Sequence, residues 1–353
     1  MVLQMSENSE ENERKRVLKD FRALVMVLGI FYTLAIVLWL ILDIFFYLVN
    51  FIIIGTAIGF GAGLRPLFSK KNRDKARKLS LALVGGYLFF GLGFGLIYIF
   101  FGYIEPENMQ IEGFWFWLLA GSFGAAVLHY LIAKILGSFA FNRGWCGWAC
   151  WTAAVLDRLP WKQSPGRIKK LGLLRYIHFV LVASIIFFLV LFLGYSRDII
   201  HGIINLWEDL PQRKIKFTQY NNIWEIPEFW WFLAGNIFYY FIGVFLAVVL
   251  KDNRAFCKYI CPIACFLKVG GKFSLLKIEG NPDECTACKA CDRVCPMDIK
   301  ISEYVEKGMR VTSSECILCL KCTDICPKDL LKISNKFDKK HIELLQYKKR
   351  KKI

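Results

Sequence analysis

Residues 284–296 read ECTACKACDRVCP, and residues 315–327 read ECILCLKCTDICP. Each stretch has the form C-x2-C-x2-C-x3-C-P. Three cysteines at intervals of three residues, on a tightly wrapped loop, can reach three irons of one cubane, and the fourth iron then needs a ligand from elsewhere. Pro296 and Pro327 fix φ and offer no N–H, so each turns the chain away from the cysteine before it. The pattern therefore predicts two iron–sulfur clusters.

The spacing resembles that of bacterial two-cluster ferredoxins, in which the cysteine before proline in one half ligates the cluster of the other half. Zinc knuckles lack the third closely spaced cysteine, and disulfide frameworks suit small secreted domains, so both alternatives fit poorly. The resemblance implies one [4Fe–4S] cluster on Cys285, Cys288, Cys291 and Cys326, and a second on Cys316, Cys319, Cys322 and Cys295. We expect six apolar side chains to wrap the clusters: Ile299, Val311, Ile317, Leu318, Ile325 and Leu330.

Composition places most of the chain in a bilayer. The 353 residues are 56% hydrophobic and include 31 Phe, with a mean hydropathy of +0.41, which is far more apolar than a soluble domain. The net charge of +17 could suggest nucleic acid, but the basic residues lie between apolar spans and in the C-terminal tail, so membrane topology explains them better. Thirteen cysteines, eight of them in ferredoxin spacing, indicate a reducing compartment.

The apolar runs predict an α-helical membrane domain with six spans, because about 20 residues cross a bilayer. Residues 23–64 form a hairpin that turns between Asp43 and Asn50. Asp43 either marks the outer turn, which we favour, or is an intramembrane functional acid. The other spans cover residues 79–104, 114–136, 174–194 and 229–250.

Basic residues predict the orientation of these spans. Residues 1–22, 65–78 and 137–173 carry five, seven and six Lys or Arg, whereas the three outer connectors carry none, none and four. Both termini should therefore be cytoplasmic in the inner membrane. The N-terminal segment is expected to be a tail and not a cleavable signal peptide, because the apolar run after it is too long.

The chain is expected to have six segments. These are an N-terminal tail (1–22), a transmembrane hairpin (23–64), a span pair with a short cysteine motif (79–173), a second pair with a second motif (174–272), a small α+β ferredoxin domain (273–335) and a basic tail (336–353).

The short cysteine motifs are an internal repeat. Residues 142–156 read NRGWCGWACWTAAVL, and residues 253–267 read NRAFCKYICPIACFL, 111 positions later. Each copy follows a pair of spans, which predicts a duplicated unit with both copies at one membrane face. The four shared cysteines are Cys146, Cys150, Cys257 and Cys261.

This cysteine quartet is a candidate metal or redox site. An i,i+4 spacing on a helical turn presents both sulfurs to one side, and four thiolates can hold a cluster or another metal. Arg143 and Arg254 would favour the thiolates. We expect a third cluster, a mononuclear iron centre or a redox-active thiol set, with Cys265 as a substitute ligand. The alternative is a group of buried free cysteines.

Taken together, the spans, the two short motifs and the twin ferredoxin motif resemble the polyferredoxin-type membrane proteins of the NapH group, the quinol-oxidising accessory subunit of periplasmic nitrate reductase. Wider relatives are the membrane domain of the nitrous-oxide-reductase regulator and copper-handling proteins of cytochrome oxidase assembly. The resemblance covers roughly residues 79–330. It departs where Trp151 follows Cys150, since the family has CxxxCP there, and in the additional hairpin at 23–64.

The sequence thus predicts a membrane-bound iron–sulfur protein. It would pass single electrons between the membrane, with a quinone as candidate, and a redox partner protein. The rival functions are a redox-dependent assembly or regulatory factor, and a channel with structural clusters. His129 and His178 could bind haem or contact a quinone, although polar contacts to neighbouring helices are the simpler reading.

Overall fold

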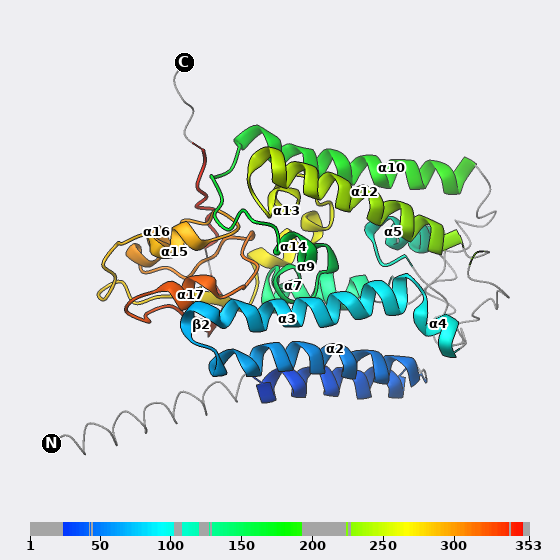
Figure 1. Cartoon of the computed structure of the whole chain (residues 1–353), viewed down its shortest axis with the longest axis horizontal. Coiled ribbons are helices and arrows are strands. Elements are labelled where there is room, and N and C mark those ends of the chain that lie inside the picture. Colours follow the sequence, from blue (N-terminus) through cyan, green and yellow to red (C-terminus); the bar gives the residue numbers. More distant parts are fainter. Residues whose placement is uncertain are drawn as a thin grey trace.

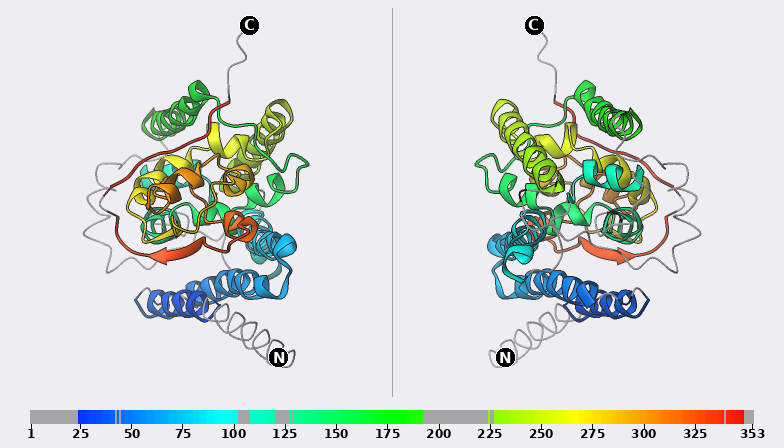
Figure 2. Two further views of the ribbon diagram at one scale, coloured as in Figure 1. Left: turned by 90° about the vertical axis from the view of Figure 1, so that its left-hand side faces the viewer. Right: turned by 90° about the vertical axis from the view of Figure 1, so that its right-hand side faces the viewer.

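The computed structural model describes residues 24–41, 43, 45–101, 108–119, 127, 129–192, 224, 227–338 and 340–348. The predicted N-terminal tail and most of the predicted outer loop before residue 229 lie outside these ranges. Long helices extend away from a smaller module that contains the C-terminal part of the chain from β1 onward (Figure 1). Viewed along the long axis, the first hairpin and the pair α10 and α12 lie on opposite sides, with short helices between them (Figure 2).

The first hairpin consists of the helix Leu24–Ile41 and α2 (Phe45–Leu64). Asp43 lies between them, exposed and with a positive φ of 52°, as expected of a turn. The hydroxyls of Tyr32 and Thr56 are 2.8 Å apart and join the two helices. Asn50, predicted at the end of the turn, is instead buried within α2, so the turn is shorter than predicted.

Among the described residues, four helices are long and apolar enough to cross a membrane: Leu24–Ile41, Phe45–Leu67, Lys169–Val190 and Phe229–Leu250. The last two contain most of α10 (Leu174–Phe192) and α12 (Pro227–Leu250) and match the predicted fifth and sixth spans. Their large apolar side chains face outward, as at Phe241, which is 68% exposed. Such a surface is suited to lipid and not to water.

The predicted third span is interrupted. It contains the end of α3 (Arg73–Gly86), a π-helical turn (Tyr87–Gly93) and α4 (Leu96–Phe101). Gly95, with a φ of 74°, separates the last two, a conformation that glycine adopts at low cost.

The predicted fourth span is described only in part. Its described residues lie in α5 (Ile111–Leu119) and in a π-helical turn (Tyr130–Leu136), which α7 (Gly137–Phe141) follows, and residues 120–126 and 128 lie outside the described ranges. The structure thus supports four spans, and the prediction of six is unconfirmed.

Residues 137–173, predicted as a cytoplasmic loop, form packed short helices. These are α7, α8 (Gly144–Trp148), α9 (Trp151–Leu156) and a 3-10 turn at Lys169–Leu173. After α12, the chain repeats the pattern with α13 (Ala255–Tyr259) and α14 (Ile263–Lys272). The connection between the spans is thus a packed structure, in which Arg143 is fully buried and Arg167 nearly so, and its predicted position at the inner face stays a prediction.

The C-terminal module is a small α+β unit, as predicted. Strand β1 (Leu276–Glu279) pairs antiparallel with β2 (Lys332–Asn335), in a register that sets Leu276 opposite Asn335. Between them lie α15 (Ala290–Val294), α16 (Ile301–Glu306) and α17 (Lys321–Ile325). Residues 340–348, predicted as part of a basic tail, pack back on the protein. Leu345 bridges to Ile299 of the module, and Tyr347 bridges to Arg167 of the membrane domain.

Candidate functional site

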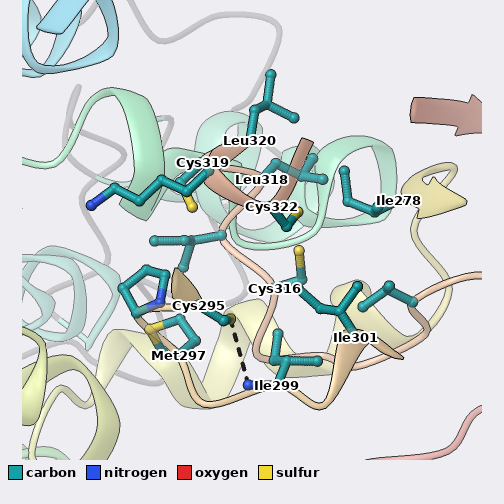
Figure 3. A pocket seen from close by; sticks show the side chains of 14 residues that line it. Ile278, Cys295, Met297, Ile299, Ile301, Cys316, Leu318, Cys319, Leu320 and Cys322 are labelled. Atoms are coloured by element: carbon teal, nitrogen blue, oxygen red, sulfur yellow. Dashed lines mark hydrogen bonds between the residues drawn. The ribbon is translucent and has the colours of Figure 1, made fainter. Parts of the chain in front are cut away.

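Two cysteine-lined pockets occupy the ferredoxin module. The proximal pocket, named for its place beside the membrane domain, is lined by Cys295, Cys316, Cys319 and Cys322 (Figure 3). The distal pocket is lined by Cys285, Cys288, Cys291 and Cys326. Both have an empty volume of ≈ 380 Å³. Each pocket thus combines the first three cysteines of one half with the last cysteine of the other, which is the arrangement that crossed ligation requires.

Apolar side chains close these pockets. Ile299, Val311, Ile317 and Leu318 line the proximal pocket, and Leu330 lines the distal one, as predicted. Ile325 lines neither pocket and is 48% exposed, so the prediction was wrong for this residue.

The backbone of both cysteine loops is strained at matching positions. Ala287 and Lys289, on either side of Cys288, have φ values of 49° and 55°. Leu318 and Leu320, which flank the second cysteine of the other half, have φ values of 47° and 62°. Each such non-glycine residue costs roughly 1–2 kcal/mol. Strain of this kind persists where the surrounding structure holds the residue in place, and it is concentrated at functional sites. Backbone turned in this way forms concave N–H nests that suit anionic iron–sulfur groups, so the loops fit the clusters.

The thiols fit metal ligation as well. Burial raises the pKa of Cys295 and Cys316 to about 12, and it raises that of Cys291 to about 12, helped by Asp292. Such thiols become thiolates when a bound metal supplies the compensating charge. Cys288 differs because it is exposed, and a hydrogen bond from the backbone N–H of Ala290 lowers the pKa of its thiol.

The proximal loop, residues 312–320, contributes Cys316 and Cys319 to the proximal pocket and rests directly on the first short cysteine motif. Asn142 Nδ2 donates to the Ser313 carbonyl at 2.9 Å, and Trp148 Nε1 donates to the Leu318 carbonyl at 3.0 Å. At Gly147, an added Cβ would lie 2.1 Å from the Ile317 carbonyl oxygen, so only glycine permits this approach. The membrane domain therefore contacts the backbone that surrounds the proximal pocket.

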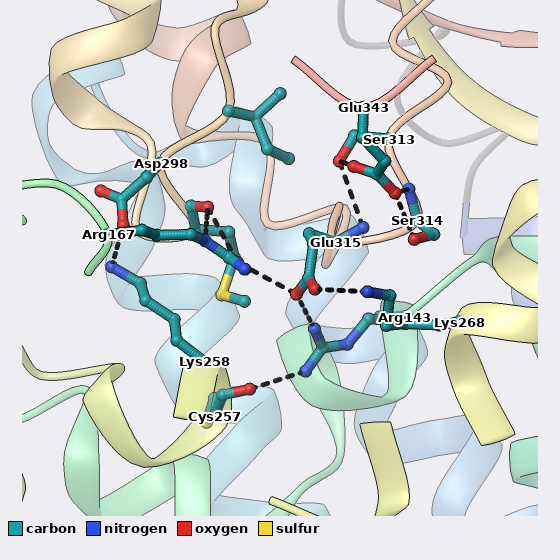
Figure 4. Close-up of polar contacts among 12 residues, drawn as sticks. Arg143, Arg167, Cys257, Lys258, Lys268, Asp298, Ser313, Ser314, Glu315 and Glu343 are labelled. Carbon is teal, nitrogen blue, oxygen red and sulfur yellow. Dashed lines mark hydrogen bonds and ion pairs between the residues drawn. The ribbon is translucent and has the colours of Figure 1, made fainter. Parts of the chain in front are cut away.

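Glu315 connects the two parts of the protein electrostatically (Figure 4). Its carboxylate is buried, and it accepts bonds from Arg143, Arg167 at 3.0 Å and Arg175 at 2.9 Å, with Lys268 at 3.2 Å. Although burial opposes ionisation, these cations hold the pKa of Glu315 well below its usual range. Sequence reasoning missed this residue, because its counterpart Glu284 also precedes a cysteine and yet is exposed.

Replacing Glu315 with Gln should destabilise the docked module, because four cations would surround a neutral side chain. Breaking a buried ion network in this way costs ~3–5 kcal/mol. Glu303→Gln is the control, since it removes only the exposed pair with Lys300, worth ~0–1 kcal/mol. The measurement is the temperature at which cluster absorbance disappears. Equal temperatures for the two variants would show that the Glu315 network does not hold the module.

The two short motifs have the same local structure and face each other. Cys150 N donates to Trp145 O at 3.1 Å, and Cys261 N donates to Phe256 O at 3.0 Å. The contacts between copies are reciprocal. Arg143 donates to the Cys257 carbonyl at 3.3 Å, and Arg254 donates to the Cys146 carbonyl at 3.0 Å.

The reciprocal contacts of Arg143 and Arg254 hold the two short motifs against each other, and the metal or redox role of the four thiols stays a prediction. The predicted helical i,i+4 pairing was wrong in detail. Helices α8 and α13 end before Cys150 and Cys261, and Cys150 has extended backbone with φ −72° and ψ 122°.

Cations surround the quartet. Arg254 Nη1 lies 3.9 Å from Cys257 Sγ, while its Nε and Nη2 donate to the two carboxylate oxygens of Asp157. Lys134 is fully buried, 3.7 Å from the centroid of the Tyr130 ring. Within the described ranges Lys134 makes no salt bridge, and its ammonium donates only to the Met109 carbonyl at 3.3 Å. Buried cations without carboxylate partners suit an anionic neighbour.

The quartet does not have the geometry of a mononuclear site. Among the residues that the structure describes, no three His, Cys, Asp or Glu side chains are grouped to hold a single metal ion. Cys265 lies apart, with Sγ 3.8 Å from the Arg175 carbonyl on the Glu315 side, so a role as substitute ligand gains no support.

The two histidines make separate contacts. His178 Nδ1 lies 2.9 Å from the Ile260 carbonyl oxygen, and the His129 ring packs edge-on against Trp145. In the described part of the chain no contact joins the two rings. The His178 contact agrees with the simpler reading of polar contacts to neighbouring helices, whereas His129 packs through its ring and its buried Nε2 has no hydrogen-bond partner among the described residues.

Two protein families with 4Fe-4S descriptions match parts of the chain. The family described as 4Fe-4S dicluster domain matches residues 284–331. The family described as 4Fe-4S binding domain matches residues 123–163 and 233–279, which contain the two short motifs. The chain therefore carries 4Fe-4S domains of the ferredoxin type.

Curated relatives are similar over parts of the chain. An uncharacterized protein of Methanocaldococcus jannaschii is 33% identical over 20% of this chain and 28% of its own length. A second from the same organism is 26% identical over 65% of this chain and 85% of its own length. The methylamine utilization ferredoxin-type protein MauN of Methylorubrum extorquens is 28% identical over 49% of this chain and 52% of its own. The match thus spans about a quarter of the first relative and half of the third. No solved structure matches the chain.

Proposed function

We propose that this chain is a membrane-bound electron-transfer protein with [4Fe–4S] clusters in the proximal and distal pockets. Bound clusters would supply one-electron redox chemistry. The observation that carries the proposal is the composition of the two pockets, each built from three cysteines of one half and one of the other. The apolar walls of the pockets and the strained N–H nests of the cysteine loops would tune the reduction potentials of the clusters. The similarity to a protein named ferredoxin-type supports the same class.

The quartet is proposed as a third redox centre between the membrane domain and the proximal pocket. Its two motifs lie in the segments that match a 4Fe-4S binding domain, and Arg143 and Gly147 of the first motif contact the proximal loop. The matching local structures support a duplicated unit. We also propose a NapH-type role with a quinone as the membrane partner. The six segments keep the boundaries predicted above, except that residues 340–348 join the ferredoxin module.

Cofactor content tests this function. Two cubanes require about eight iron and eight acid-labile sulfide per chain, and a third cubane raises both to about twelve. In purified protein, a water-soluble quinol such as duroquinol should reduce the clusters at catalytic rates. Full cluster content without reduction by the quinol would favour the rival assembly or regulatory factor. Fewer than about eight irons in anaerobically prepared protein would contradict the proposal itself.

The proposed orientation places the module and both termini in the cytoplasm. Two parts of the membrane domain contact the same module through basic side chains. In segment 65–78, Arg65 pairs with Asp324 at 2.6 Å and Lys70 with Asp329, and in the second short motif Lys258 pairs with Asp298. These segments therefore share one side, and the positive-inside bias makes that side cytoplasmic.

Ferricyanide, which does not cross membranes, should oxidise reduced clusters in inverted vesicles and not in right-side-out vesicles. Detergent-opened vesicles of both kinds are the control, because all clusters should then react. Oxidation confined to right-side-out vesicles would reverse the orientation and would also remove the argument for a reducing compartment.

A further inference from the structure

The two cysteine loops of the ferredoxin module have opposite surroundings. Residues 312–320 are buried or half-buried throughout, because the membrane domain and the C-terminal segment 340–348 cover them. Residues 281–289 occupy the same positions in the other half, yet every residue except the half-buried Cys285 is exposed. In the part of the chain that the structure describes, no hydrogen bond or salt bridge joins residues 281–289 to the membrane domain. One of two similarly built loops is thus docked and the other is free.

The matched geometry makes the comparison meaningful. Helices α15 and α17 follow the two loops at corresponding positions, and the positive φ values at Ala287 and Lys289 recur at Leu318 and Leu320. In the docked loop, the carbonyls of Ser313 and other residues accept hydrogen bonds from the membrane domain. The corresponding face of residues 281–289 can serve a second partner in the same way.

Charge around the free loop favours an acidic partner. Lys289 and Lys328 line the distal pocket, and exposed Arg293 donates to the Cys288 carbonyl at 3.1 Å. Within the described residues, none of these three cations makes a salt bridge. The module's carboxylates are mostly engaged elsewhere, because Asp298, Glu315 and Asp324 pair with membrane-domain cations. Asp283 and Glu284 lie within the loop itself, so residues 281–289 together with Arg293 and Lys328 carry three cations and two carboxylates.

We propose that residues 281–289, with Arg293 and Lys328, form the docking surface for a soluble one-electron carrier protein whose contact face is acidic. The inference rests on the proposed function, because it needs a cluster in the distal pocket. Cys288 is the single exposed cysteine among the thirteen, all of which the structure describes. One electron passes between the cluster beside Cys288 and the carrier, and no bond forms or breaks. Complementary charge raises the rate of such encounters more than their affinity.

Two small inorganic oxidants of opposite charge test whether the docking surface attracts anions. Reduced holoprotein in detergent is mixed with anionic ferricyanide or with cationic hexaammineruthenium(III), and the two oxidation rates are compared. Changing Lys289→Glu and Lys328→Glu together should lower the ratio of the ferricyanide rate to the ruthenium rate on the order of tenfold at low salt, with little effect at high salt. Lys340→Glu, an exposed charge on the segment packed beside Thr312, is the control and should preserve the ratio.

A spectroscopic readout tests exposure without turnover. An anionic, water-soluble dysprosium complex should speed the spin relaxation of the distal EPR signal several-fold more than that of the proximal signal. The double variant should reduce this difference. Equal relaxation of both signals, or an unchanged rate ratio in the double variant, would overturn the docking surface while both clusters stay present. Absence of the clusters themselves, seen in iron and sulfide content, would instead overturn the proposed function.

Discussion

Cys295→Ala is expected to abolish the EPR signal of the cluster bound by Cys316, Cys319 and Cys322, and to preserve the signal of the cluster bound by its own triad. The reason is geometric, because Cys295 lines the proximal pocket and not the distal one. A cubane that loses one of four thiolates retains an exposed iron and is readily lost or converted. The measurement is EPR of the fully reduced protein, with iron content falling by about four.

The matched control is Cys326→Ala, which should produce the opposite loss. Cys326 lines the distal pocket with the first triad, so its removal should spare the proximal signal. If each substitution removed the signal of the triad in its own half, ligation would be uncrossed and the pocket assignment would be wrong. Loss of both signals in both variants would indicate collapse of the module. Cys295→Ser, whose oxygen can still ligate iron, would then separate folding from ligation.

How far the sequence predicts the site depends on whether the relevant contacts are local. The spacing of the eight ferredoxin cysteines determines the two loops, so their division between two pockets could be predicted. The docking of the module could not. Glu284 and Glu315 both precede the first cysteine of a motif, and only the docked fold gives Glu315 its four cations. Local sequence carries no signal for a contact made across 172 positions to Arg143.

The span predictions differ for a related reason. Hydropathy identified the first hairpin, α10 and α12, because lipid-facing helices are apolar over their whole length. It did not find the interruption at Gly95, since a positive φ leaves hydropathy unchanged. The positive-inside count also treated Arg143 and Arg167 as exposed loop charges. Both instead lie buried against Glu315, because a folded module covers the face that the count assigned to water.

The quartet prediction has the largest consequence for electron flow. A variant with Cys146→Ser and Cys257→Ser should retain both ferredoxin signals and lose about four irons. It should also no longer be reduced by duroquinol. Both cysteines are buried at the contact between the two short motifs, where Arg143 and Arg254 cross to the carbonyl of the opposite copy. Removing one thiolate from each copy therefore damages the centre from both sides.

Two further variants decide whether the quartet binds metal through its thiolates. Cys265→Ser removes a nearby thiol on the Glu315 side and should change neither iron content nor reduction by the quinol. Lys134→Met removes a buried cation without a salt bridge among the described residues, in electrostatic reach of Cys146, Cys150 and Cys261. Since the ammonium stabilises added negative charge, the third centre should become harder to reduce in this variant. Wild-type protein with only about eight irons, together with a double-serine variant that accepts electrons at the wild-type rate, would falsify the redox role and leave the quartet as packing.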